Sequence, residues 1–281
     1  MVRYGVEATE LIRIRRSWRT FQEQPLTQDH TKNLTSFIED LDPPPFGTGI
    51  RFELIDTGST LKRFSGTYGV AKGARTFLAG AAHPGTRTEE DFGYLFEAIL
   101  LRATELGLGT CWMGGTFNSG FFADRILRTA DEIIPAVSPV GYPASARSVV
   151  DSLFAASAGS RRRKPGESLF FTERFGVPLD VENHPYRIPL EMVRLAPSAS
   201  NRQPWRILAT GDVFHFFVQR SLGYKALFRE VDMQRIDLGI AMLHFELGSS
   251  ELGLGGRWEE HDPALNDLPA RTQYIVSWVP D

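Results

Sequence analysis

The residues with the clearest chemical potential lie near the start of the chain, in the sequence Arg15-Arg16-Ser17-Trp18-Arg19. In an extended segment side chains alternate, so Arg15, Ser17 and Arg19 are expected to lie on one side. Two guanidinium groups that flank a hydroxyl suit a phosphate monoester, because each donates a fork of hydrogen bonds. A solvated basic face that follows a helix is the other interpretation, and the spacing leaves both open.

A second polar group lies in residues 196–205, which read Ala-Pro-Ser-Ala-Ser-Asn-Arg-Gln-Pro-Trp. The prolines restrict φ and predict an extended turn after a helix over Tyr186 to Leu195. Several hydrogen-bonding side chains fall within a few positions: Ser198, Ser200, Asn201 and Gln203. They indicate either a ligand-binding turn or ordinary turn chemistry with Trp205 as a core anchor.

A third feature is the run of four cations from Arg161 to Lys164, followed by Pro165. Read alone, such a run is typical of a solvated surface loop or linker. The surrounding residues 155–167 are polar and contain Gly and Pro. This segment is therefore the predicted seam between two parts of the chain.

Composition excludes several classes of protein. The 281 residues are 42% hydrophobic, enough for a sizeable core, and the net charge of −3 gives no global attraction to nucleic acid. One cysteine permits neither an intrachain disulfide nor a cysteine-built zinc site. No stretch approaches the roughly 18 apolar residues of a membrane span, and the first residues do not resemble a secretory signal. We expect a cytoplasmic protein that binds no membrane and no nucleic acid.

Familiar catalytic motifs are absent from the sequence. It contains no His-Glu-x-x-His metal motif, no phosphate-binding loop that ends in Gly-Lys-Ser/Thr, and no dinucleotide fingerprint. His215, in an alternating strand pattern, His244, on a helix, and Cys111, beside apolar residues, are expected to be structural. The sequence thus predicts no metal and no nucleophile–base pair.

An internal repeat organises the chain. DFGYLFEAILLRATELGLG starts at Asp91, and DLGIAMLHFELGSSELGLG starts 146 positions later at Asp237. Each predicts an amphipathic helix that stops at a glycine, Gly107 or Gly253. The first helix is expected to bury one face, made of Leu95, Ala98, Ile99 and Ala103.

A second set of matches, at an offset of 153, runs in the same order: Gln24-Pro25-Leu26 with Val177-Pro178-Leu179, Pro44 with Pro197, and Thr57-Gly58 with Thr210-Gly211. Each copy is predicted to be helix, turn, strand, second strand, long helix and third strand. The strand candidates are Arg51 to Asp56, Arg75 to Ala82, Glu132 to Val140, Arg206 to Ala209, Val213 to Val218 and Gln273 to Val279.

Taken together, four motifs resemble the nitroreductase family of FMN-dependent oxidoreductases, and the resemblance covers almost the whole chain. They are Arg-x-Ser-x-Arg-x-Phe at 15–21, a helix with GLGTCWMGG at 92–115, Gly-Tyr-Pro followed by the basic stretch at 141–165, and the Pro-Ser-x-x-Asn-x-Gln-Pro-Trp segment at 197–205. The implied fold is α+β, with two related halves, 1–165 and 166–281, each a β-sheet flanked by helices.

The two halves have lost opposite parts of the motif set. Where the second half has Asn201, the first has Thr48 within PPFGTG, and where the first has Arg-x-Ser-x-Arg, the second has SLFFTERF. Family members are typically homodimers with FMN at the subunit interface. The resemblance therefore implies a fused, intramolecular pseudo-dimer that keeps one FMN site and is a monomer.

The resemblance also implies the ligands of FMN: Arg15, Ser17, Arg19, Gly114, Gly115, Arg161, Arg163, Pro197, Ser198 and Asn201. NAD(P)H is the implied electron donor, with ping-pong hydride transfer through flavin N5 to a nitroaromatic, a quinone or another small acceptor. No catalytic side chain is required. The alternatives are a flavin-sequestering protein with little turnover, an enzyme that cleaves reduced flavin with oxygen, and a fold relic without flavin.

Overall fold

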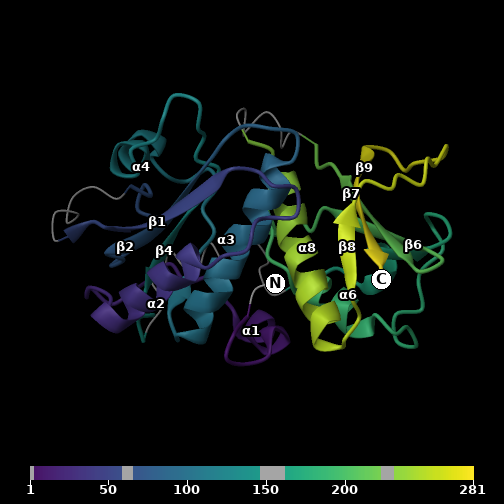
Figure 1. Cartoon of the computed structure of the whole chain (residues 1–281), viewed down its shortest axis with the longest axis horizontal. Coiled ribbons are helices and arrows are strands. Elements are labelled where there is room, and N and C mark those ends of the chain that lie inside the picture. The colour runs from purple at the N-terminus through teal and green to yellow at the C-terminus, as the bar shows by residue number, and fades with distance from the viewer. Residues whose placement is uncertain (1–2, 59–65, 146–161, 223–230) are drawn as a thin grey trace. The chain divides into compact units, whose positions relative to one another are not determined.

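The computed structural model describes residues 3–58, 66–145, 162–222 and 231–281. The chain divides into two compact units (Figure 1). Unit 1 comprises Met1–Val6 and Ile14–Gly159, and unit 2 comprises Glu7–Arg13 and Ser160–Asp281. Nearly all of the first helix, α1 (Ala8–Ile14), therefore belongs to the unit that is otherwise built from the second half of the chain.

The sheet of unit 1 has four strands in the order β1-β2-β4-β3, all antiparallel to their neighbours. Their bounds are β1 (Ile50–Asp56), β2 (Thr76–Ala82), β3 (Gly109–Thr110) and β4 (Val137–Gly141). Every residue of β2 is buried. Within it, a Cβ atom on Gly80 would lie 2.6 Å from the rings of Phe52 and Phe92, so this position accepts only glycine.

Three helices in the described part of unit 1 accompany this sheet: α2 (Gln28–Glu39), α3 (Thr88–Glu105) and α4 (Ser119–Arg125). Thr27 caps α2 by accepting a hydrogen bond from His30 N, and Asn118 caps α4 in the same way. The apolar α3 is buried over most of its length and packs against α2, β2 and β3. It is the central element of unit 1.

Unit 2 has a five-stranded sheet in the order β5-β6-β7-β9-β8, in which β5 pairs parallel to β6 and the other pairs are antiparallel. The strands are β5 (Phe170–Thr172), β6 (Trp205–Thr210), β7 (Val213–Gln219), β8 (Gly256–Glu259) and β9 (Thr272–Pro280). The helices α6 (Arg187–Leu195) and α8 (Met233–Glu251) pack against each other. Phe245 of α8 contacts the rings of Phe216, Trp258 and Trp278 in the core.

The two units share one connectivity, which supports the proposed duplication. Apart from β5, which has no counterpart in unit 1, two strands precede each long helix and two follow it, and the orders β1-β2-β4-β3 and β6-β7-β9-β8 are equivalent. Side-chain contacts repeat as well. The indole Nε1 of Trp112 donates to Glu97 at 2.6 Å, and that of Trp258 donates to Glu246 at 2.7 Å, each glutamate lying on its unit's long helix.

Most of the predicted elements are confirmed. The helix predicted over Tyr186 to Leu195 is α6, and the expected core face of α3 is buried. The strand predicted from Glu132 is wrong in its first half, because β4 starts at Val137 and the Glu132 carboxylate instead pairs with Arg51. Two strands precede the long helix of unit 1 as predicted, whereas unit 2 has β5 as a third. In each unit two strands follow the helix rather than one, since β3 and β8 are too short for a periodic signal.

One proposed counterpart is also wrong. The segment SLFFTERF contains β5, which pairs with β6, whereas residues 17–21 bridge to Thr110 and Lys72. The two segments therefore hold different places in their units. No helix in the described residues is long and apolar enough to span a membrane.

Candidate functional site

Arg15 lies directly after α1 and is fixed by a buried carboxylate. Its side chain is 6% exposed, and its Nε lies 3.3 Å from Oε1 of the fully buried Glu97. The other oxygen of Glu97 accepts the hydrogen bond from Trp112. Nη1 of Arg15 is buried and has no hydrogen-bond partner among the described residues. A buried donor without a partner costs about 1–3 kcal/mol, which marks this guanidinium as a candidate for binding an anion.

The rest of the Arg-x-Ser-x-Arg segment pairs with the main chain of unit 1. Ser17 forms a parallel bridge with Thr110 of β3, and Trp18 N donates to Thr110 O at 2.7 Å. The carbonyl of Arg19 accepts from Lys72 N at 2.8 Å. Main-chain pairing therefore holds Ser17 beside β3 and Arg19 beside Lys72, both within unit 1.

Gly114 and Gly115 follow Met113, which bridges to Val137 of β4. Gly114 is half-buried and Gly115 is exposed, in the turn that leads from β3 to α4. Both glycines thus belong to unit 1, downstream of the strand to which Ser17 pairs.

The loop at residues 196–205 is strained and internally bonded. Ser200, Asn201 and Gln203 have φ angles of 49°, 52° and 49°, in the left-handed region. Such a conformation costs on the order of 1–3 kcal/mol per non-glycine residue and occurs often at functional sites. Ser198 Oγ stabilises the turn by accepting from Gln203 N at 2.9 Å. Trp205 is fully buried, so its predicted role as a core anchor is confirmed.

The structure joins this loop to the basic segment. Arg163 donates from Nη1 to Asn201 Oδ1 at 2.8 Å and from Nη2 to Leu195 O at 2.9 Å. Asn201 Nδ2 donates to Arg162 O at 2.8 Å, and Gln203 Oε1 accepts from Lys164 N at 2.8 Å. Residues 162–164 are thus anchored to unit 2 rather than forming a free linker, while Arg161 lies outside the described residues.

A buried aspartate at the start of each long helix holds the corresponding loop. In unit 1, Asp91 accepts from Phe46 N at 3.0 Å and from Thr48 N at 2.9 Å. In unit 2, Asp237 accepts from Ala199 N at 2.8 Å, while its Oδ2 has no partner among the described residues. Burial raises the pKa of both carboxyl groups, that of Asp237 well above its ordinary value, and the hydrogen bonds from Thr48 and Phe46 oppose the rise at Asp91.

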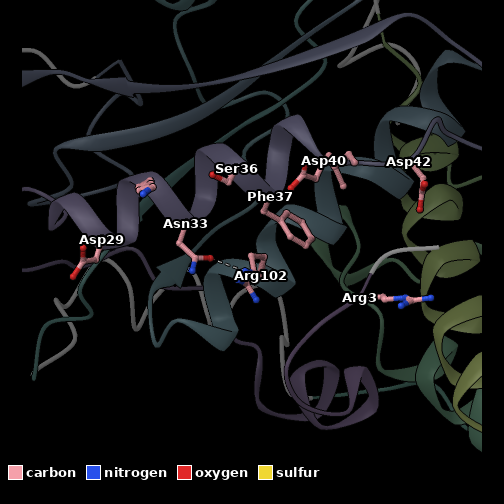
Figure 2. Close-up of a pocket in the computed structure, with 10 residues that line it drawn as sticks. Arg3, Asp29, Asn33, Ser36, Phe37, Asp40, Asp42 and Arg102 are labelled. Carbon is pink, nitrogen blue, oxygen red and sulfur yellow. Dashed lines mark hydrogen bonds between the residues drawn. The ribbon is translucent and has the colours of Figure 1, made fainter.

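A pocket of about 600 Å³ lies in unit 1, away from these residues (Figure 2). Its lining carries both signs of charge: Arg3, Asp29, Lys32, Asn33, Ser36, Phe37, Asp40, Leu41, Asp42 and Arg102. Figure 2 shows Arg102 bound to Asn33, with which its Nε forms a 2.8 Å hydrogen bond. Of the residues predicted to bind a cofactor, none that the structure describes lines this pocket, and its mixed charge favours no single class of anion.

The comparisons with known proteins identify the family. A family model described as "Putative TM nitroreductase" matches residues 7–249. The chain belongs to this nitroreductase family. Family membership makes it an oxidoreductase and confirms the resemblance that the four motifs indicated.

A solved structure supports the nitroreductase fold. A crystal structure described as a putative nitroreductase from Thermotoga maritima is 22% identical and covers 98% of this chain and 94% of its own, with a TM-score of 0.61. A nitroreductase with bound FMN from Desulfitobacterium hafniense is 15% identical, and the match covers 51% of this chain and 93% of that one, with a TM-score of 0.41. A search of curated proteins found no significant match.

The predicted FMN ligands do not include two buried carboxylates that hold site residues in place. Glu97 and Asp237 were not predicted as site residues, although Glu97 is a charged residue within an apolar helix and Asp237 starts a repeat. The structural roles expected for His215, His244 and Cys111 are confirmed. His215 pairs with Ser277, His244 pairs with Met192 O, and Cys111 is buried. In the described residues no group of side chains is arranged to hold a metal ion.

Proposed function

We propose that this nitroreductase is an FMN-dependent NAD(P)H oxidoreductase that acts on a nitroaromatic, a quinone or another small acceptor. The observation that carries the proposal is the buried Arg15 guanidinium, whose Nη1 has no partner among the described residues. The terminal phosphate of FMN carries nearly two negative charges at neutral pH, so it would supply the acceptor that Nη1 lacks.

The residues present fit such a cofactor. In unit 1, Arg15 and Arg19 would neutralise the phosphate, Ser17 would donate a hydrogen bond, and Gly114 and Gly115 offer main chain without a Cβ atom. In unit 2, Pro197, Ser198 and Asn201 lie in the strained loop, supported by Arg163. When bound, FMN supplies the hydride transfer between NAD(P)H and the acceptor. The side chains would bind and orient it, and none needs to act as an acid or a base.

The proposal predicts a flavin spectrum. Purified protein, titrated with FMN, should show the visible bands of oxidised flavin and reach one FMN per chain. Asn201→Ala should weaken FMN binding by about tenfold, because it removes one polar contact and releases Arg163. Asn183→Ala is the matched control, since that amide bonds an exposed Asp180 in the same unit.

Three outcomes separate the alternatives. Absence of bound flavin at high FMN concentration would show that the proposed function is wrong. Bound flavin that neither NADH nor NADPH reduces would leave a flavin-binding protein without this activity. Loss of flavin absorbance after reduction in air, with new products, would instead indicate cleavage of the cofactor. Sedimentation of the loaded protein tests the proposed monomer.

A further inference from the structure

Three cations of unit 2 gather around the main chain of Gln203. Lys164 Nζ donates to Gln203 O at 3.3 Å, and Arg206 Nη1 donates to the same oxygen at 3.1 Å. Arg202 is the preceding residue in the chain, and its charge acts on Lys164. The carbonyl oxygen of Gln203 thus accepts hydrogen bonds from two cationic side chains, and Arg202 is a third cation near them.

The charges of these three side chains are not balanced by acidic groups. Among the described residues, no carboxylate lies within ion-pair distance of Lys164, Arg202 or Arg206. The pKa of Lys164 is lowered to about 8, first by burial and then by the positive charges of Arg206 and Arg202. Burial likewise lowers the pKa of Arg206. The electrostatic potential around these three side chains is therefore positive, and it disfavours their own protonated, charged forms.

Some arginines of the same unit pair with carboxylates. Arg194 pairs with Glu191 at 2.6 Å, and Arg257 pairs with Glu259 at 3.0 Å. Lys164, Arg202 and Arg206 have no such pair among the described residues. Arg202 is exposed, and Lys164 and Arg206 are half-buried, so a solute reaches them without unfolding the loop. An anion would relieve their mutual repulsion.

We infer that Lys164, Arg202 and Arg206 bind a phosphate group of a nucleotide. The lysine ammonium contributes a point charge, and each guanidinium contributes a planar fork of donors that matches phosphate oxygens. None of these residues belongs to the proposed FMN ligands, and the inference does not depend on bound FMN. The phosphate of FMN is already assigned to Arg15 and Arg19, so the nucleotide inferred here is a nicotinamide nucleotide.

Calorimetric titration of the full chain with 2′,5′-ADP tests the site, with adenosine as the probe that lacks phosphate. We expect 2′,5′-ADP to bind, adenosine to bind far more weakly, and added salt to weaken the binding. Lys164→Gln and Arg202→Gln should each weaken 2′,5′-ADP binding about tenfold, as expected for loss of one charge-assisted hydrogen bond. Arg202→Gln keeps the test valid if a buried substitution unfolds the protein, because Arg202 is exposed.

Arg257→Gln is the matched control. It removes the same charge from β8, which lies at the opposite edge of the sheet from the β5–β6 pair, and should leave binding unchanged. Competition identifies the source of the phosphate. Displacement of 2′,5′-ADP by NADPH but not by FMN would support the inference. Displacement by FMN but not by riboflavin would assign the site to the flavin phosphate and overturn it. The inference is overturned if riboflavin displaces the probe as well as FMN does, or if both variants bind it within twofold of the natural chain.

Discussion

Replacing Arg15 by alanine is expected to weaken FMN binding by about a hundredfold or more. The change removes charge-assisted hydrogen bonds worth about 1.5–3 kcal/mol each, and about 2.7 kcal/mol corresponds to a hundredfold. It also takes the cation of this ion pair away from the buried Glu97 carboxylate, so we expect a loss of folding stability of about 3–5 kcal/mol. FMN titration and urea unfolding measure the two effects separately.

The double variant Arg15→Ala/Glu97→Gln separates ligand binding from folding. A neutral amide at position 97 needs no cation, so the variant should recover much of the lost stability while FMN binding stays weak. Arg51→Ala is the matched control, because Arg51 also pairs with a buried glutamate of unit 1, Glu132. It should lower stability and leave FMN affinity unchanged. Normal FMN affinity in the double variant would show that Arg15 does not bind FMN.

The aspartates at the start of the long helices should respond differently to the same substitution. Asp91 accepts one main-chain hydrogen bond on each oxygen, so Asp91→Asn places an amide N–H against a main-chain N–H. We expect a loss of about 2–3 kcal/mol of unfolding free energy. Asp237 accepts the bond from Ala199 N on Oδ1, which an amide oxygen preserves, so Asp237→Asn should change stability by less than about 1 kcal/mol.

The pH dependence gives a second readout at Asp237. Burial raises the pKa of this carboxyl in the folded state, so its contribution favours folding below the ordinary pKa and is lost as pH rises towards the folded-state pKa. The Asp237→Asn variant has no ionisable carboxyl group at this position. The variant should therefore gain stability relative to the natural chain between acid and neutral pH in urea unfolding. If Asp91→Asn and Asp237→Asn lost equal unfolding free energy and Asp237→Asn showed no such pH trend, the expected difference between the two aspartates would be wrong.

Local sequence patterns predicted most helices and strands. They could not predict the contacts between distant residues that position the candidate site. The long helices and inner strands were predicted because their apolar residues recur with a clear period, as in α3 and β7. The pairing of β5 with β6 depends on which sheet edge is open, so alignment of SLFFTERF with the Arg-x-Ser-x-Arg segment failed. Contacts such as Arg15 with Glu97 join residues 82 positions apart, and no local pattern predicts them.

The packing of α1 against a late part of the chain determines how long its apolar side chains stay exposed during synthesis. Leu11 and Ile12 are buried in the finished fold, and Thr9 N donates to Glu251 Oε1 at 3.2 Å, 242 positions away. At about 5–20 residues per second, a ribosome needs roughly 12–50 s to synthesise that intervening chain. During this time α1 has left the ribosome, but the helix that holds it has not been made. Its apolar side chains are therefore available to chaperones, or to other nascent chains, until synthesis is almost complete.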